Sequence, residues 1–249
     1  MTAVLEARRL SRRFGALAAI SDLTLSVQPG EFRAVIGPNG AGKTTLFNLL
    51  TGKITPTAGE IFFRGENVTS LQDSVRCRRG MSRTFQITNI FPELTVRENV
   101  RLAIQLKGRG NFRILGGKSR LLATARQAEE SLALLGLLER AEVLASILPH
   151  GEQRLLEIAM AVAQNPQLLL LDEPTQGLSS EDTYAVIEII RRVARERQLT
   201  VLLVEHDMEV VFSLADRISV LNFGRLVAEG TPDEVRKNPD VQMVYLGPE

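Results

Sequence analysis

One glycine-rich stretch, residues 37–45, limits what this chain can fold into more than any other part of it. It reads Gly-Pro-Asn-Gly-Ala-Gly-Lys-Thr-Thr and lies between two largely apolar segments, residues 32–36 and 46–50. This order predicts a strand, a glycine-rich turn and a helix. Two glycines that frame four residues before a Lys-Thr pair match the spacing of the phosphate-binding P-loop. An ordinary glycine-rich turn is disfavoured because the strand and the helix are both in place, and we predict a nucleotide-binding α/β core.

The residue types of this loop suit phosphate chemistry. Glycines let backbone N–H groups converge on phosphate oxygens because no Cβ is in the way. The helix that follows adds its free N–H groups and the positive end of its dipole. Lys43 is expected to place a charge on the β- and γ-phosphates, and the Thr44 hydroxyl to bind Mg²⁺. The residues expected to hold the nucleotide here are Gly37, Pro38, Asn39, Gly40, Ala41, Gly42, Lys43, Thr44 and Thr45.

The composition sets broad limits. The 249 residues suit one large domain or two closely joined ones, with enough apolar content for a core. The formal charge of +1 gives no long-range field that would favour nucleic acid or strong membrane attraction. The single cysteine, Cys77, excludes an internal disulfide and is compatible with a reducing compartment. No apolar run reaches the roughly 18 residues that span a bilayer and no signal peptide is recognisable, so a soluble cytoplasmic chain is expected.

The segments before and after the P-loop predict further strands. Residues 4–10 and 23–27 alternate apolar with polar side chains, and residues 58–65 read as another strand bounded by glycines. We expect them to form an antiparallel sheet beside the nucleotide core. Phe14 lies in a polar setting, where its ring could either stack on a purine or anchor a loop by burial.

From about residue 75 to residue 166 helical signals replace the strand pattern. Thr95 and Glu98 form the signature of a capping box at a helix start. Residues 107–120 contain five basic side chains, four glycines and no acidic residue. This segment is either a solvated loop between helices or a docking surface for a partner or a lipid headgroup.

A second phosphate-side group follows the apolar run at residues 168–171, which is typical of a strand buried on both faces of a parallel sheet. The run ends in Asp172 and Glu173. Adjacent strand residues point to opposite sides, so the two carboxylates need different roles. Asp172 is expected to hold Mg²⁺ and Glu173 to polarise the attacking water. The alternative is a pair of solvated carboxylates at a strand end.

A third buried strand, residues 200–204, precedes Glu205 and His206. Ligands bind at the carboxyl ends of parallel strands, so His206 is expected to contact the γ-phosphate rather than to be structural. Residues 148–153 precede another helix, and a glycine followed by polar side chains at a helix start can face an anion. Taken alone, that stretch would be a helix cap.

Assembled in this order, the motifs resemble the nucleotide-binding subunit of an ATP-binding cassette transporter over nearly the whole chain. The resemblance implies ATP and Mg²⁺ as cofactors. It makes Phe14 the aromatic that stacks on adenine and Gln86 a ligand of Mg²⁺ and the attacking water, which also senses the membrane partner. Residues 148–153 are similar to the signature motif, and Gly151, Glu152 and Gln153 would contact nucleotide. His206 is similar to the switch histidine, and with Glu173 and Gln86 it completes the catalytic set.

The stretches 83–86, 204–208, 229–232 and 238–240 and the basic insertion are similar to branched-chain amino acid importers in particular, in the larger of their two ATPase subunits. This implies membrane permease subunits as partners, a substrate-binding protein acting indirectly, and a peripheral location on the cytoplasmic face of the inner or plasma membrane. A lipopolysaccharide-export ATPase is the nearest alternative. A soluble regulatory cassette protein is a second one, and no nucleic acid partner is expected because the chain has one P-loop and almost no net charge.

The family pattern implies a single domain over residues 1–249. Residues 1–86 and 167–249 would form the P-loop core with its mostly parallel sheet and antiparallel β subdomain, and residues 87–166 an inserted helical subdomain. In the family, two cassettes pack head to tail, and the signature helix of one caps the γ-phosphate on the other. The partner is a sister subunit or a second copy. The chain departs from the pattern at Pro149, where the signature normally has serine, and at Ser179, where aspartate or asparagine is frequent.

Overall fold

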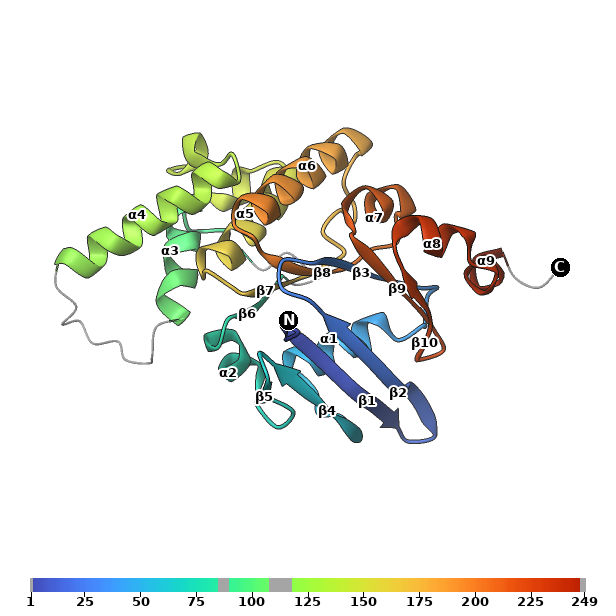
Figure 1. Cartoon of the computed structure of the whole chain (residues 1–249). Helices are drawn as coiled ribbons and strands as arrows, with labels where there is room; N and C mark the ends of the chain where they lie inside the picture. The colour runs from blue at the N-terminus through green and yellow to red at the C-terminus, as the bar shows by residue number, and fades with distance from the viewer. Residues whose placement is uncertain (1, 85–89, 108–117, 247–249) are drawn as a thin grey trace.

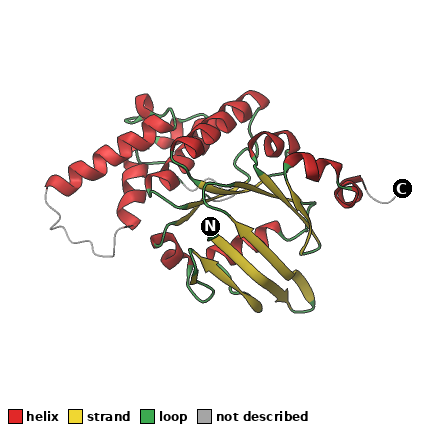
Figure 2. Cartoon of the chain, viewed as in Figure 1, coloured by secondary structure: helices red, strands yellow, loops and turns green. Residues whose placement is uncertain are grey.

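The structure, a computed structural model, describes residues 2–84, 90–107 and 118–246. Two β-sheets and a set of helices form three layers, with the antiparallel strands below the larger sheet and most helices above it (Figures 1 and 2). Helices α3 and α4 extend from one end of the molecule, and the C-terminal helices α8 and α9 lie at the other (Figure 1).

The smaller sheet is antiparallel and has the order β2-β1-β4-β5. Its strands are β1 (Leu5–Phe14), β2 (Leu17–Val27), β4 (Ala58–Phe63) and β5 (Glu66–Asn67). Strands β1 and β2 are longer than the alternation predicts. Register shifts between Ala7 and Leu10 and between Leu10 and Arg12 interrupt the period of two. The outer half of each strand therefore lacks the alternation by which a strand is predicted.

The larger sheet has the order β10-β9-β3-β8-β7-β6 and is parallel except between β9 and β10. Its strands are β3 (Phe32–Ile36), β6 (Met81–Arg83), β7 (Leu168–Asp172), β8 (Thr200–Val204), β9 (Arg217–Asn222) and β10 (Arg225–Gly230). The predicted fold class is confirmed. Strand β6 lies in the region where helical signals dominate the sequence. It was not predicted because three residues are too few to show a period.

Side chains of β7 divide between the two faces of this sheet. Leu169 and Leu171 pack into the core formed with α5 (His150–Ala163), α6 (Ser180–Glu196) and α7 (Met208–Leu214). Leu168 and Leu170 pack into the core formed with α1 (Lys43–Thr51) and the antiparallel strands. A strand buried on both faces needs apolar residues at every position, which explains the continuous leucine run.

The remaining helices lie at the two ends of the molecule. Helices α3 (Val96–Lys107) and α4 (Lys118–Leu134) pack against each other and against α5. The predicted capping box is confirmed, since the Glu98 carboxylate accepts from the Thr95 backbone N–H at 2.9 Å. The shorter elements are α2 (Asp73–Arg78), η1 (Leu138–Arg140), η2 (Ala145–Ile147), α8 (Pro232–Lys237) and α9 (Pro239–Leu246). Within the described ranges, no helix has the length and apolar character that crossing a membrane requires.

Candidate functional site

The predicted phosphate-side segments meet at one edge of the parallel sheet. Strands β3, β8 and β7 are neighbours, so the chain leaves all three at the same edge. A cleft of about 570 Å³ opens there. It is lined by Phe14, Leu17, Ala18, Ala19, Asn39, Gly40, Ala41, Gly42, Lys43, Thr44, Thr45, Glu173, Gln176, His206 and Phe223. Phe14 is 45% exposed beside this cleft, so the alternative of a buried loop anchor is wrong.

Two glycines hold the P-loop in a path that other residues could not follow. A Cβ on Gly37 would lie 2.2 Å from the carbonyl oxygen of Leu221, and one on Gly42 would lie 2.7 Å from that of Ala19. Gly42 also has a φ of 104° and immediately precedes α1. It carries no side-chain cap, and the first turn of α1 contains no acidic residue. The helix therefore begins with backbone donors suited to an anion.

Lys43 lies buried in the floor of the loop. Its Nζ donates to the carbonyl oxygens of Gly37 at 2.6 Å and Pro38 at 3.1 Å. Burial lowers the pKa of Lys43, and the nearby charges of Glu173 and Asp172 oppose that shift. An ammonium group held between carbonyls and two carboxylates is in place to meet a phosphate.

Asp172 ends β7 with a side chain that is 1% exposed. Its Oδ2 accepts from Arg83 at 2.6 Å, whereas its buried Oδ1 has no hydrogen-bond partner among the described residues. A buried carboxylate oxygen without a hydrogen-bond partner is suited to bind a metal ion. Thr44, another expected ligand, lines the P-loop cleft. Mg²⁺ in nucleotide sites takes one or two carboxylates together with phosphate oxygens and water. No group of three acidic, histidine or cysteine side chains that could hold a metal ion by themselves is present in the described part of the chain, and this mode of binding needs none.

Glu173 and His206 face each other across the cleft. The Glu173 Oε1 lies 2.5 Å from the His206 Nε2, and Glu173 is buried while His206 is 44% exposed. Glu173 has a φ of 49°, an unfavourable backbone conformation for a residue with a side chain. The strand therefore stops at Asp172, and Glu173 turns out of the sheet toward His206. Gln86, the third expected catalytic residue, lies outside the described residues.

Arg154 has a role that sequence reasoning missed. It lies buried in α5 and donates to the carbonyl oxygens of Asp172 at 2.9 Å, Glu173 at 2.6 Å and Pro174 at 3.0 Å. Its other nitrogen contacts the Glu157 carboxylate at 2.5 Å. Arg154 thus holds the backbone that carries both site carboxylates. The only signal in the sequence is an arginine on the apolar side of a helix.

Glu205 was also missed as a site residue. Its Oε1 accepts from the backbone N–H of Thr175 at 2.9 Å and from the Thr175 hydroxyl at 2.6 Å. Its Oε2 accepts from the backbone N–H of His206 at 3.0 Å. One buried carboxylate therefore joins the turn after Glu173 to the loop that carries His206. A carboxylate at the end of an apolar strand is the signal that could have revealed it.

The start of α5 does not reach the P-loop cleft of the same chain. Gly151, Glu152 and Gln153 are absent from its lining. Glu152 lies 3.4 Å from Arg140, and the Gln153 side chain donates to the Leu148 carbonyl at 2.9 Å. The structure therefore brings together the P-loop, Phe14, Asp172, Glu173 and His206, and leaves the signature-like residues elsewhere.

The C-terminal helix α9 lies beside the P-loop. The Tyr245 hydroxyl of α9 lies beside the Gly37 backbone. Burial raises the pKa of Tyr245 to about 12, and the nearby Gly37 backbone opposes the shift. The P-loop is thus in contact with a segment some two hundred residues further along the chain.

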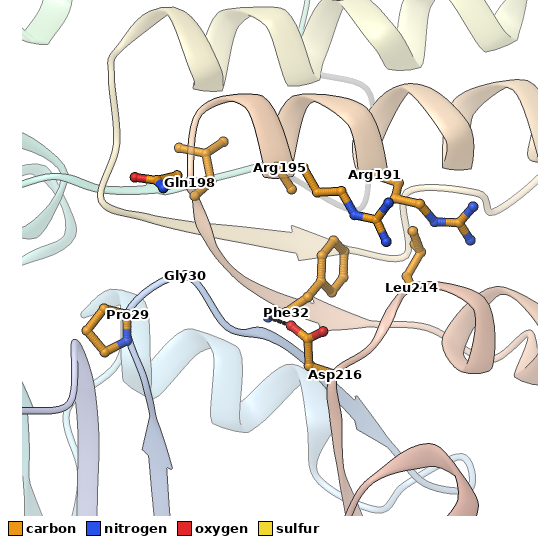
Figure 3. Close-up of a pocket in the computed structure, with 10 residues that line it drawn as sticks. Pro29, Gly30, Phe32, Arg191, Arg195, Gln198, Leu214 and Asp216 are labelled. Atoms are coloured by element: carbon orange, nitrogen blue, oxygen red, sulfur yellow. Dashed lines mark hydrogen bonds between the residues drawn. The ribbon is translucent and has the colours of Figure 1, made fainter. Parts of the chain in front are cut away.

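A second cavity, of about 520 Å³, lies beside the N-terminal end of β3, between that strand and α6 (Figure 3). Figure 3 shows Arg191 and Arg195 of α6 above Phe32 and Asp216, and the Phe32 N–H donates to Asp216 at 2.8 Å. This cavity lies where strand β3 begins, whereas open α/β sheets bind ligands beyond the carboxyl ends of their strands. The P-loop cleft is therefore the candidate functional site.

Two family models match the chain. One, described as "ABC transporter", matches residues 20–176. A shorter one, described as "Branched-chain amino acid ATP-binding cassette transporter", matches residues 225–247, which include β10 and the C-terminal helices α8 and α9.

Curated proteins and solved structures match over nearly the whole chain. The "High-affinity branched-chain amino acid transport ATP-binding protein LivG" of Escherichia coli (strain K12) is 41% identical over 249 residues, which cover 98% of each chain. An ATP-binding cassette of an ABC transporter, solved in its ADP conformation, is 25% identical with a TM-score of 0.86 and full coverage of both chains, each 100%. A dimeric cassette in a post-hydrolysis state, bound to ADP and Pi, is 27% identical with a TM-score of 0.76, covering 92% of this chain and 98% of that one.

These matches confirm the resemblance drawn from the motifs. The first family model covers more than half of the chain, and the LivG relative covers nearly all of it. The chain belongs to the ABC transporter family, as one of its ATP-hydrolysing subunits.

Proposed function

We propose that this subunit powers the import of branched-chain or related amino acids through membrane permease partners. The observation that carries the proposal is the P-loop cleft, where Lys43, Asp172, Glu173 and His206 converge in a chain that is 41% identical to the LivG relative over almost its full length. The C-terminal match to the branched-chain family model supports the same substrate class.

In this proposal the cleft binds ATP with its phosphates on the P-loop. The N–H groups at the start of α1 and the Lys43 ammonium bind the phosphates, and the exposed face of Phe14 stacks on the adenine. Thr44, Asp172 and Gln86 would hold Mg²⁺, which supplies charge neutralisation on the phosphates when bound. Glu173 accepts the proton of the attacking water.

His206 completes the catalytic set of the proposal. Its ring lies 2.5 Å from the Glu173 carboxylate, so it orients that carboxylate and can donate toward a γ-phosphate in the cleft. Glu205 holds the His206 backbone, which keeps the pair together.

We further propose one domain over residues 1–249, with a core of residues 1–86 and 167–249 and a helical subdomain of residues 87–166. Because Gly151, Glu152 and Gln153 lie away from the cleft of their own chain, they would reach the nucleotide of a second cassette. That cassette would be a sister subunit or a second copy. The permease would hold the pair at the cytoplasmic face of the membrane, a substrate-binding protein would act indirectly, and no nucleic acid would take part.

The proposal is tested by transport in the cell that makes the protein. Replacing the native subunit with a Glu173→Gln variant should abolish uptake of radiolabelled leucine, isoleucine and valine while uptake of an unrelated solute continues. Normal branched-chain uptake together with defective lipopolysaccharide export would assign the subunit to an exporter. Normal branched-chain uptake together with normal lipopolysaccharide export would indicate a regulatory cassette protein.

Removing the Phe14 ring should weaken nucleotide binding only by removing the contact with the adenine base. Phe14→Ala is expected to raise the Kd for ATP about 2- to 12-fold, the equivalent of about 0.5–1.5 kcal/mol of ring contact, and to leave inorganic triphosphate binding unchanged. Titration calorimetry measures both. Phe91→Ala is the matched control, because Phe91 is 43% exposed and lies outside the cleft. An equal loss of affinity for inorganic triphosphate would show that Phe14 stabilises the P-loop and does not stack on the adenine base.

Serine at position 149 should strengthen the signature helix. Pro149 is the N-cap of α5 and offers no side-chain hydrogen bond to it. Pro149→Ser adds a hydroxyl that can cap the helix and meet a γ-phosphate across the dimer. We expect the ATPase rate of the assembled transporter to rise about tenfold, the equivalent of about 1.4 kcal/mol from one hydrogen bond to a charged group. An unchanged phosphate-release rate in the assembled complex would refute the role of position 149.

A further inference from the structure

Arg83 connects two parts of the site that the sequence separates. It ends β6, and its side chain is 10% exposed. One nitrogen lies 2.6 Å from the Asp172 Oδ2. Another donates to the Asn48 side-chain oxygen at 2.8 Å and lies 3.3 Å from the Thr51 hydroxyl. Asn48 and Thr51 lie on α1, the helix that also carries Thr44.

The chemistry of this contact gives the two oxygens of Asp172 different surroundings. A guanidinium keeps its charge at any ordinary pH and binds in a plane, so it fixes the orientation of the carboxylate. Oδ2 is held by Arg83, while Oδ1 is buried and has no hydrogen-bond partner in the described part of the chain. The ion pair thus leaves one defined oxygen for a metal ion.

We propose that Arg83 is a positioning residue for the metal that accompanies the nucleotide. It aims the Asp172 Oδ1 at the metal and, through Asn48 and Thr51, ties the Asp172 strand to the helix that bears Thr44. Two of the protein oxygens expected to bind Mg²⁺, those of Thr44 and Asp172, are therefore held in a fixed relation by one side chain. The inference rests on the proposed function, since it assumes that Thr44 and Asp172 hold Mg²⁺.

The positive charge of Arg83 also has an effect opposite to that of orientation. A positive charge beside a carboxylate weakens its attraction for a cation. If charge competition outweighed orientation, removal of Arg83 would tighten metal binding. If orientation dominates, removal should weaken it, since partners that orient metal ligands are typically worth about 10- to 100-fold in metal affinity.

The experiment uses Mn²⁺ as the probe in full-length protein that carries Glu173→Gln, which blocks turnover. Mn²⁺ is titrated into the ATP complex, and bound ion is followed by electron paramagnetic resonance. Arg83→Met should raise the half-saturating Mn²⁺ concentration about 10-fold or more, and Arg83→Lys should recover part of that loss. The affinity for metal-free ATP should change less than about twofold. This pattern separates positioning from a general loss of structure.

Two further variants keep the test decisive. Arg79→Met is the matched control, because Arg79 is 40% exposed and pairs with Glu66 on the surface. It should leave Mn²⁺ binding unchanged. If Arg83→Met does not fold, Asn48→Ala removes the anchor on α1 while the ion pair to Asp172 stays, and a several-fold loss of Mn²⁺ affinity is expected.

The outcomes separate this inference from the proposed function. Mn²⁺ binding that is unchanged or tighter in Arg83→Met, or unchanged in Asn48→Ala, overturns the positioning role while leaving the nucleotide site intact. Failure of the Glu173→Gln parent itself to take up Mn²⁺ with ATP would overturn the metal site of the proposed function, and the role of Arg83 with it.

Discussion

Glu173→Gln should lower kcat for ATP hydrolysis by about 10²–10⁴, the usual contribution of a positioned general base. Glutamine has nearly the same shape as glutamate, so it can still accept a hydrogen bond from His206, 2.5 Å from the native Oε1. It cannot accept a proton from the attacking water. The Kd for ATP should therefore stay within about twofold of the native value, since ground-state binding does not need the base. Phosphate-release kinetics and titration calorimetry measure the two quantities.

Glu66→Gln provides the control for this prediction. Glu66 is an exposed carboxylate on β5 whose partner is Arg79 at 2.6 Å, so its replacement should leave kcat unchanged. A Glu173→Gln variant that keeps native kcat would assign the base to another group. The same variant reports on assembly when its mass is measured with and without Mg-ATP. A dimer that forms only with Mg-ATP would show that the Pro149 signature supports self-association. A monomer that binds ATP would indicate a required sister subunit.

Arg154→Met should lower the free energy of unfolding by about 3–5 kcal/mol, the usual effect of removing one partner of a buried ion pair. The Glu157 carboxylate would lose a contact of 2.5 Å while it remains buried. The carbonyl oxygens of Asp172, Glu173 and Pro174 would each lose one hydrogen-bond donor as well. Because a domain of this kind has only about 5–15 kcal/mol of stability, the loss should appear clearly in urea denaturation.

A double variant tests whether the buried charge causes the effect. Arg154→Met with Glu157→Leu removes both charges, so it should be more stable than Arg154→Met alone. Arg126→Met is the control, because Arg126 is 84% exposed and pairs with Glu130 across one turn of α4. Its replacement should cost no more than about 0.5 kcal/mol. A loss below about 1 kcal/mol for Arg154→Met would mean that the carbonyls of the β7 turn are held by other contacts.

Most of the site follows from short stretches of sequence. The P-loop was predicted because its glycines, lysine and threonine are contiguous, and the leucine run before Asp172 and Glu173 because a strand buried on both faces must be apolar throughout. His206 was placed by the same logic, at the end of a third apolar strand. In each case the information lies within about ten neighbouring residues, which is the range over which periodicity and spacing act.

Other features needed the order of strands in the sheet. Arg83 meets Asp172 across 89 positions because β6 pairs with β7 at the sheet edge, and β6 itself was too short to be predicted. Arg154 reaches the turn after β7 from α5, and Glu205 reaches Thr175 across 30 positions. The sequence does not show which group a charged side chain will pair with. Only the packed fold, in which a buried charge must be paired, decides which groups it holds.

The nucleotide-binding motifs, the fold class and the family could thus be predicted from the amino-acid sequence, because they depend on local patterns in the chain. The contacts that support the site became visible only in the folded chain. They are the ion pair of Arg83 with Asp172, the hydrogen bonds of Arg154 to the backbone, and the position of Tyr245 beside Gly37. These depend on contacts between distant segments, whose geometry is set when the sheet and helices pack.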